Sequence, residues 1–427
     1  MLRKTFFALT VPRIDYDLLP MVLPKPEKIS PTKYIRLFHA KNGNQSSPTG
    51  FHVGDKVKTG QKLALYGDDP AYVIASASGT IRSISPYSGD FGKNYAAITI
   101  EIDTNEVYDD QFKAQAAEPN LDAALNHLSF IPGSPPLSTL SDTEQEIKTI
   151  VISGVDSDLL IGTRQYIVKS RFEDVRRGIE ILKKISGVEQ VYLITAGETV
   201  QTYGHLGAHV KSIDTRYPSA LPQLIMKNVL GEVVPAGKTS ADLGVCFFSS
   251  EAVASIGRAY MDDQIPVTKT LTLITKDGNR RLIETKIGTP IRDILETCDV
   301  SINEGDRIIF GGPMRGSAVY SLEHPIQPDT DGLLVLDRSN AAYTSEYPCI
   351  NCGDCVRVCP ANIQINVLVR FLEAGQYEAA AESYDLLSCI DCGLCSFVCV
   401  SKIPIYQYIK LAKYELGRAE ASEETHA

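Results

Sequence analysis

The sequence predicts a multidomain protein of mixed α+β and α/β class, and three observations lead to that prediction. The chain has 427 residues, more than one hydrophobic core usually organises. A β-branched run, a helical periodicity and a second β-branched run follow one another between residues 149 and 195, which is the order of a parallel βαβ unit. Eight of the ten cysteines lie between Cys349 and Cys399, and such clustering in a long chain is typical of bound metal.

Composition and charge narrow the class of protein further. Hydrophobic residues make up 44% and charged residues 22% of the chain, as in ordinary soluble proteins. The net charge of -10 does not suit a general nucleic-acid binder, so we expect no nucleic-acid partner. No apolar run is long enough to cross a bilayer, and residues 1–12 lack the pattern of a signal peptide. We therefore expect a soluble, cytoplasmic chain that could still dock on a membrane complex.

The N-terminal segment predicts a small barrel of short strands. In residues 53–64, Gly54 and Gly60 break two short strands, and a turn followed by a strand is expected at 75–84. This pattern resembles the barrel-sandwich fold of biotinyl and lipoyl domains. Those carriers present a lysine at a hairpin tip, but residues 66–78 contain none, so we expect a structural barrel.

A βαβ unit is expected next. Residues 149–153 and 191–195 are β-branched runs, and Ser170 with Glu173 has the spacing of a capping box at the start of the helix between them. Gly187 is placed to end that helix. The turn after the first strand has one glycine and two aspartates, which is not a dinucleotide fingerprint.

Residues 265–320 predict a small strand-rich domain. The β-prone run 268–275 and residues 280–286 flank a turn, which indicates a hairpin, and a short helix is expected at 290–297. Residues 308–316 carry three glycines that permit a close backbone approach. Whether that approach serves a ligand or packing stays open.

The cysteines form two runs of the pattern C-x2-C-x2-C-x3-C, the spacing of bacterial two-cluster ferredoxins. Three thiolates of each run wrap one cluster, and the fourth reaches the other cluster. Structural zinc, the alternative, usually takes separated CxxC pairs and fits these runs poorly. We assign Cys349, Cys352, Cys355 and Cys399 to one [4Fe–4S] cluster, and Cys389, Cys392, Cys395 and Cys359 to a second.

Helices are expected around these runs. Residues 366–385 predict two helices with a turn at Gly375, and residues 404–416 predict another after Pro404. The module is therefore a helical ferredoxin, and because clusters carry single electrons, the residues indicate a one-electron relay.

In the order of its units, the chain resembles the C subunit of the Rnf ion-translocating ferredoxin:NAD oxidoreductase complex. The resemblance covers nearly the whole chain and is most specific at residues 53–64, 217–218, 231–235, 288–290, 311–314 and 348–404. It implies a barrel-sandwich hybrid at 1–125, a Rossmann-like α/β domain at 126–260, a β-grasp domain of the SLBB type at 261–338, and a helical two-[4Fe–4S] ferredoxin domain at 339–427.

The resemblance also implies a place and partners. Family members lie on the cytoplasmic side of membrane subunits, which couple electron flow to sodium or proton movement. They are similar to the NADH-binding subunit of respiratory complex I, which carries FMN.

Three segments depart from the family's flavin and nucleotide site. The glycine-rich run is replaced by residues 130–136, which keep one glycine and contain three prolines, and proline has no backbone N–H to offer a phosphate. The acidic segment is replaced by 153–160, and residues 219–223 lack the family's glycine and lysine cluster. We therefore expect that FMN and NADH binding is lost, and we assign no flavin-binding or catalytic residue.

The resulting hypothesis is an electron-transfer subunit of a membrane-associated Rnf-type complex. It would relay electrons between a soluble donor, either ferredoxin or a partner subunit, and the membrane subunits. One alternative is a functional FMN-containing NADH dehydrogenase subunit of the same complex. The other is an adaptor subunit of a soluble oxidoreductase.

Overall fold

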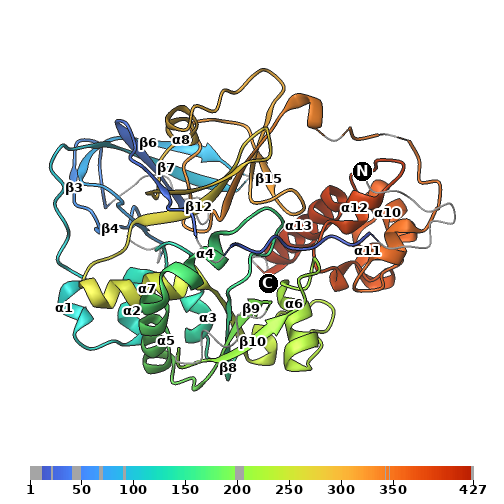
Figure 1. Ribbon diagram of the computed structural model, residues 1–427, viewed down its shortest axis with the longest axis horizontal. Helices are drawn as coiled ribbons and strands as arrows, with labels where there is room; N and C mark the ends of the chain where they lie inside the picture. Colours follow the sequence, from blue (N-terminus) through green and yellow to red (C-terminus); the bar gives the residue numbers. More distant parts are fainter. Residues whose placement is uncertain are drawn as a thin grey trace.

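The computed structural model describes most of the chain. The described residues are 12–20, 23–40, 50–66, 71–89, 93–197, 206–341, 343–345 and 347–424. The expectation about a signal peptide at residues 1–12 falls almost entirely outside them. In Figure 1 the N-terminal barrel and the β-grasp strands lie together at one side, the α/β region lies below them, and the C-terminal helices occupy the opposite end.

The N-terminal barrel consists of short antiparallel strands. One sheet has the order β2-β7-β6-β3, and β4 and β5 pair separately. The expected glycine turns are confirmed, because Gly54 and Gly60 have positive φ angles of 100° and 85°. The strands are β2 (Tyr34–Ala40), β3 (Lys56–Val57), β4 (Lys62–Leu63), β5 (Val73–Ile74), β6 (Gly79–Ser88) and β7 (Asn94–Ile102).

The middle region contains a four-stranded parallel sheet with the order β10-β9-β8-β11. The predicted βαβ unit is confirmed, since β8 and β9 pair in parallel on either side of α4 and α5. The strands are β8 (Thr149–Ser153), β9 (Gln190–Ala196), β10 (His209–Ile213) and β11 (Val245–Ser249). The helices are α1 (Lys113–Ala116), α2 (Leu121–Leu128), α3 (Leu137–Ser141), α4 (Thr163–Ser170), α5 (Phe172–Ser186), α6 (Pro222–Ile225), η3 (Met226–Leu230), η4 (Ala241–Leu243) and α7 (Ser250–Asp262).

The predicted capping box at Ser170 is wrong. Ser170 is the last residue of α4, and its hydroxyl donates a hydrogen bond back to the carbonyl of Tyr166. The helix that was expected to begin there, α5, follows Arg171 without a side-chain cap. Its other end is as predicted: Gly187 takes the left-handed conformation and donates its N–H to the carbonyl of Lys183.

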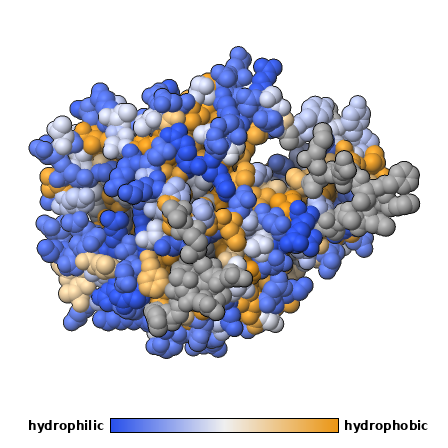
Figure 2. Space-filling view, in the orientation of Figure 1, coloured by the Kyte–Doolittle hydropathy of each residue, from blue (hydrophilic) through white to orange (hydrophobic). Residues whose placement is uncertain are grey.

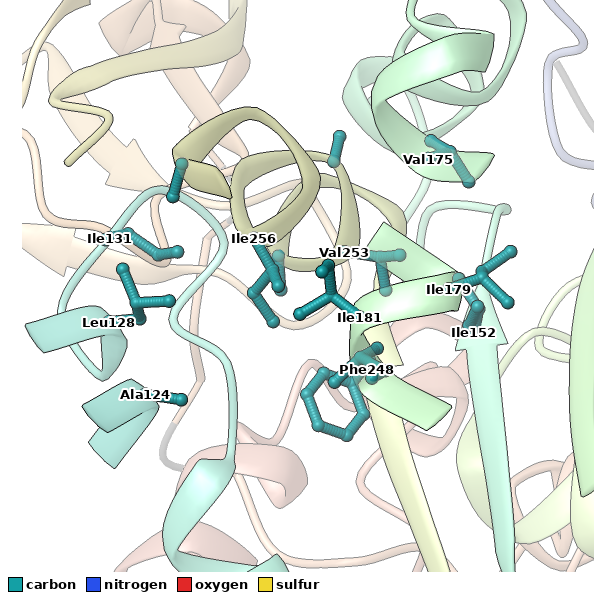
Figure 3. Close-up of a cluster of buried hydrophobic side chains, with 14 of the residues drawn as sticks. Ala124, Leu128, Ile131, Ile152, Val175, Ile179, Ile181, Phe248, Val253 and Ile256 are labelled. Atoms are coloured by element: carbon teal, nitrogen blue, oxygen red, sulfur yellow. The ribbon is translucent and has the colours of Figure 1, made fainter. Parts of the chain in front are cut away.

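Helices α5 and α7 pack closely on the sheet and on each other. Figure 3 shows Val175 and Ile179 of α5, Val253 of α7 and Ile152 of β8 pointing into one apolar core. Gly178 of α5 permits the close approach, because a Cβ there would lie 1.9 Å from the carbonyl oxygen of Val253.

The β-grasp region forms a six-stranded sheet with the order β1-β13-β12-β16-β14-β15. The predicted hairpin is confirmed, since β12 and β13 pair antiparallel. Its edge strand β1 precedes the barrel in the chain, so the two regions are tied together by the backbone. The elements are β1 (Glu27–Ile29), β12 (Thr268–Ile274), β13 (Arg280–Lys286), α8 (Ile291–Thr297), β14 (Arg307–Phe310), β15 (Ser317–Val319), β16 (Gly332–Leu336) and η5 (Arg338–Asn340).

The C-terminal region is helical, as predicted, and Gly375 turns the chain between α10 and α11 with a φ of 69°. Within the described residues, no helix combines the length and apolar character that a membrane crossing requires. The face in Figure 2 is mostly hydrophilic, with hydrophobic residues in separate patches. The helices are α9 (Asp354–Val358), α10 (Ile365–Glu373), α11 (Tyr377–Ser383), η6 (Leu386–Ser388), α12 (Leu394–Val398) and α13 (Ile405–Glu424).

Gly178→Ala tests the α5–α7 packing. The added methyl group would collide with the backbone of α7, so we expect the free energy of unfolding to fall by about 1–3 kcal/mol. Gly417→Ala is the matched control: this exposed helical glycine of α13 has open space around it, so its substitution should stabilise by about 0.5–1 kcal/mol. Urea unfolding measures both changes, and equal stabilities would contradict the packing account.

Candidate iron–sulfur site

The two cysteine runs belong to a repeat in which the cysteines, the short helix among them and the start of the next helix recur 40 residues later in the chain. Gly353 and Gly393 have φ angles of 76° and 73°, and each immediately precedes a short helix, α9 or α12. Asn351 and Asp391 likewise share left-handed φ angles of 58° and 54°. The two loops therefore have the same backbone path around their cysteines.

The first group of cysteines combines both runs. Cys349, Cys352 and Cys355 of the first run line one cavity together with Cys399, the last cysteine of the second run. Each run places its fourth cysteine just after its short helix, where Cys359 and Cys399 each donate an N–H to a carbonyl three residues earlier at 3.3 Å.

The second group shows the reciprocal arrangement. Burial raises the pKa of Cys395 well above its ordinary value, and the neighbouring Cys389, Cys392 and Cys359 raise it further. Burial also raises the pKa of Cys392 to about 11, and Cys359 again contributes. Cys359 of the first run thus faces the cysteines of the second.

The donor set fits iron–sulfur chemistry. Each group offers four sulfur ligands, and thiolates are the ligands that iron–sulfur clusters take. Burial raises the pKa of the Cys355 thiol to about 11, and binding of metal to such a thiol releases its proton. A site for a single metal ion is a different arrangement. In the described part of the chain, no group of three or more His, Cys, Asp or Glu side chains forms one.

The two groups differ in exposure. Cys352 is exposed, and its neighbour Ile350 is 66% exposed, so the first group lies at the protein surface. Cys392 and Cys395 are buried, and Cys392 belongs to an apolar core shared with the α/β region.

Long-range contacts fix the second group against the rest of the molecule. The Tyr217 hydroxyl donates a hydrogen bond of 2.6 Å to the carbonyl of Cys392. The Arg315 Nε donates to the carbonyl of Asp391 at 3.0 Å. Sequence reasoning missed both residues as neighbours of the cysteines, although each lies in or next to a segment on which the family resemblance rests.

Arg315 also borders a cavity outside the cysteine region. This cavity of about 570 Å³ lies between the barrel, the α/β region and the β-grasp region. Its lining combines aromatic and charged side chains. The aromatic residues include Phe38, Tyr87, Tyr95, Phe310 and Tyr320, and the charged ones are Lys93, Asp156, Asp158, Arg164, Arg315, Asp329 and Asp331.

The aspartates in place of the family's acidic motif hold loops together. The carboxylate of Asp156 accepts the N–H of Arg164 at 2.8 Å, at the start of α4. The carboxylate of Asp158 accepts the N–H groups of Met314 and Arg315 at 3.1 and 2.7 Å. Burial raises the pKa of Asp156 to about 6. Both groups therefore already have internal partners.

The segment in place of the glycine-rich run is packed in a similar way. The N–H of Gly133 donates to the carbonyl of Pro328 at 2.7 Å, and that of Ser134 donates to Ile131 at 3.0 Å. A Cβ at Gly133 would lie 2.2 Å from the backbone nitrogen of Ala252. The segment thus approaches α7 closely, and neither of these N–H groups is left for a ligand.

Comparisons with known proteins agree with this architecture. Residues 27–105 match the family described as the RnfC barrel sandwich hybrid domain, and residues 348–404 match the 4Fe-4S dicluster domain family. The expected fold class, with a barrel-sandwich domain in front and a helical dicluster domain at the end, is confirmed.

Curated relatives point in the same direction. The chain is 30% identical over 386 residues to the C subunit of the ion-translocating oxidoreductase complex of Pseudomonas aeruginosa, covering 85% of this chain and 50% of the relative. It is 28% identical over 393 residues to the protein of the same name from Pasteurella multocida, covering 85% and 46%. The C subunit of the Na(+)-translocating ferredoxin:NAD(+) oxidoreductase complex of Acetobacterium woodii is 26% identical over 335 residues, covering 73% and 75%.

The chain therefore resembles the C subunits of Rnf-type complexes, as its motifs predicted, and spans about half the length of the first two of these relatives. Among solved structures, a chain of an NAD+-reducing [NiFe]-hydrogenase superposes with a TM-score of 0.46 at 10% identity, covering 72% of this chain and 65% of that one.

On this geometry we propose that each cysteine group holds one [4Fe–4S] cluster with the fourth ligand exchanged. Cys399→Ser should then damage the cluster of Cys349, Cys352 and Cys355, and Cys359→Ser should damage the other, because each removes one ligand from the opposite loop. Iron analysis and electron paramagnetic resonance (EPR) of the reduced proteins measure this.

Cys298→Ala is the control, since this buried cysteine lies in the β-grasp core. It should leave both clusters intact. If Cys399→Ser instead perturbed only the cluster of Cys389, Cys392 and Cys395, the exchanged assignment would be wrong.

Proposed function

We propose that the chain is an electron-relay subunit of an Rnf-type ion-translocating oxidoreductase complex. The observation that carries the proposal is the meeting of cysteines from both runs around one cavity, in a region that matches the 4Fe-4S dicluster domain family. The similarity to C subunits over 85% of the chain supports the membrane complex as the setting. Its other subunits would hold the chain peripherally on the cytoplasmic side of the membrane.

Bound [4Fe–4S] clusters would supply one-electron couples. The two cysteine groups of such a relay differ in their exposure to solvent. Cys352 and Ile350 open the first group to the surface, where a redox partner can approach. Cys392 and Cys395 lie inside, behind Tyr217 and Arg315, where water is excluded. Ferredoxin, another redox protein or a partner subunit would exchange electrons at the exposed end.

The relay role does not require a flavin of its own. Where relatives would hold a phosphate, the N–H groups of Gly133 and Ser134 are already donated within the protein. Four aspartates, among them Asp156 and Asp158, line the cavity of about 570 Å³ and outnumber its three cations, so the lining is not a phosphate cradle. We therefore propose that FMN and NADH are not bound.

One observation favours the alternative of an FMN-containing NADH dehydrogenase subunit. The cavity of about 570 Å³ is lined in part by aromatic side chains, and its lining residue Arg315 contacts the loop of the second cysteine group. A planar redox ligand in this cavity would be next to that group. The competing functions therefore predict opposite results for flavin content.

Anaerobic purification followed by metal, flavin and NADH assays decides between them. The relay role predicts about eight irons per chain, as two cubanes require, no flavin, and no change in the cluster spectrum on addition of NADH. Chemical reduction with dithionite is the control that the clusters can accept electrons.

Stoichiometric flavin with rapid bleaching by NADH would contradict the relay proposal and favour the dehydrogenase. Purification from the native organism shows which other subunits are recovered with the chain. Recovery of membrane subunits supports the Rnf-type setting, whereas recovery with only soluble oxidoreductase subunits would favour the adaptor alternative.

A further inference from the structure

A lysine from the last helix lies against the loop of the second cysteine group. The Nζ of Lys413, on α13, donates to the carbonyl of Cys389 at 2.7 Å. The same Nζ lies 3.0 and 2.9 Å from the two carboxylate oxygens of Asp391. Three directed contacts of one ammonium group fix a positive charge beside this loop.

Asp391 brings a negative charge close to the sulfur of Cys389. Its Oδ1 lies 3.7 Å from the Sγ of Cys389, and its backbone N–H points at that sulfur at 3.5 Å. The pKa of Cys389 is raised to about 12, chiefly by burial; Asp391 contributes to the rise and Lys413 opposes it. The ammonium and the carboxylate thus act on one cysteine with opposite signs.

The first half of the repeat lacks this pair of charges. The residue 40 positions before Asp391 is Asn351, which has the same left-handed backbone and accepts a neutral hydrogen bond from Asn366 at 2.7 Å. The residue 40 positions before Lys413 is Glu373, which is exposed at the end of α10. The two loops are alike in backbone and unlike in charge.

This difference matters because reduction adds an electron to a group that is already anionic. Burial of Cys392 and Cys395 disfavours the extra charge, and the Asp391 carboxylate disfavours it further. A fixed ammonium at Lys413 opposes both effects, and charges and hydrogen bonds near the sulfurs are known to set cluster potentials.

We propose that Lys413 is a positioning residue that raises the reduction potential of the cluster held by Cys389, Cys392, Cys395 and Cys359, and so keeps this buried cluster reducible. The inference rests on the proposed function, since it requires both clusters to be present. It concerns one cluster only, because the first group has no corresponding cation at the matching position of the repeat.

The test is an EPR-monitored redox titration of the anaerobically purified full chain, with signals assigned by the Cys359→Ser and Cys399→Ser variants. Lys413→Gln should shift the reduction equilibrium of the second cluster at least about tenfold toward the oxidised form, a fall of about 59 mV in its midpoint potential. The first cluster should not shift. Lys413→Arg keeps the charge and should restore the midpoint.

Asp391→Asn provides an independent arm, because removal of the carboxylate should raise the same midpoint. Arg418→Gln is the matched control: it removes one positive charge from the same helix at an exposed ion pair with Glu415, and neither midpoint should move. If Lys413 served only the structure of the loop, Lys413→Gln and Asp391→Asn would not shift the midpoint in opposite directions.

The inference is overturned if Lys413→Gln and Lys413→Arg shift the midpoint equally, if both clusters shift together, or if nothing shifts. Failure of the proposed function gives a different result, because it would show in the wild-type protein as stoichiometric flavin and bleaching by NADH, or as the absence of clusters. If Lys413→Gln does not fold, Asp391→Asn still tests the sign of the charge effect at this loop.

Discussion

The crossing of the two cysteine runs is the constraint on which the C-terminal region depends. Cys399 can join Cys349, Cys352 and Cys355 only if the two loops face each other, although 40 residues separate corresponding positions. Helices α9 and α12 lie in contact, and α10 and α13 pack through one apolar core around the cysteines. The insertion between the runs thus serves to bring two similar loops together.

The two loops that cross in this way have unequal surroundings. The second loop is held by Tyr217 of the α/β region and Arg315 of the β-grasp region, whereas the first loop faces solvent at Cys352. The α/β and β-grasp regions therefore contribute the wall that buries one cysteine group. Such an arrangement gives a relay an accessible end and an insulated end, independent of whether the neighbouring cavity holds a ligand.

Local patterns in the sequence predicted much of this structure. The cysteine spacing, the βαβ unit, the β12–β13 hairpin and the turn at Gly375 all depend on residues close together in the chain. The capping box at Ser170 failed because that hydroxyl bonds back to Tyr166 and ends the preceding helix instead. A short motif cannot distinguish these two uses of a serine.

The residues around the second cysteine group could not be predicted in the same way. Arg315 and Tyr217 reach it across 76 and 175 residues of sequence, and no local pattern encodes such contacts.

The central claim is that one chain holds two clusters with exchanged ligands, and the EPR spectrum of the fully reduced protein tests it most directly. Exchanged ligands hold the clusters close together, so we predict two reduced clusters per chain whose spectrum shows magnetic interaction between them. Partial reduction should yield the spectrum of an isolated cluster first. Two magnetically isolated signals at full reduction, a single cluster per chain, or zinc in place of iron would contradict the account.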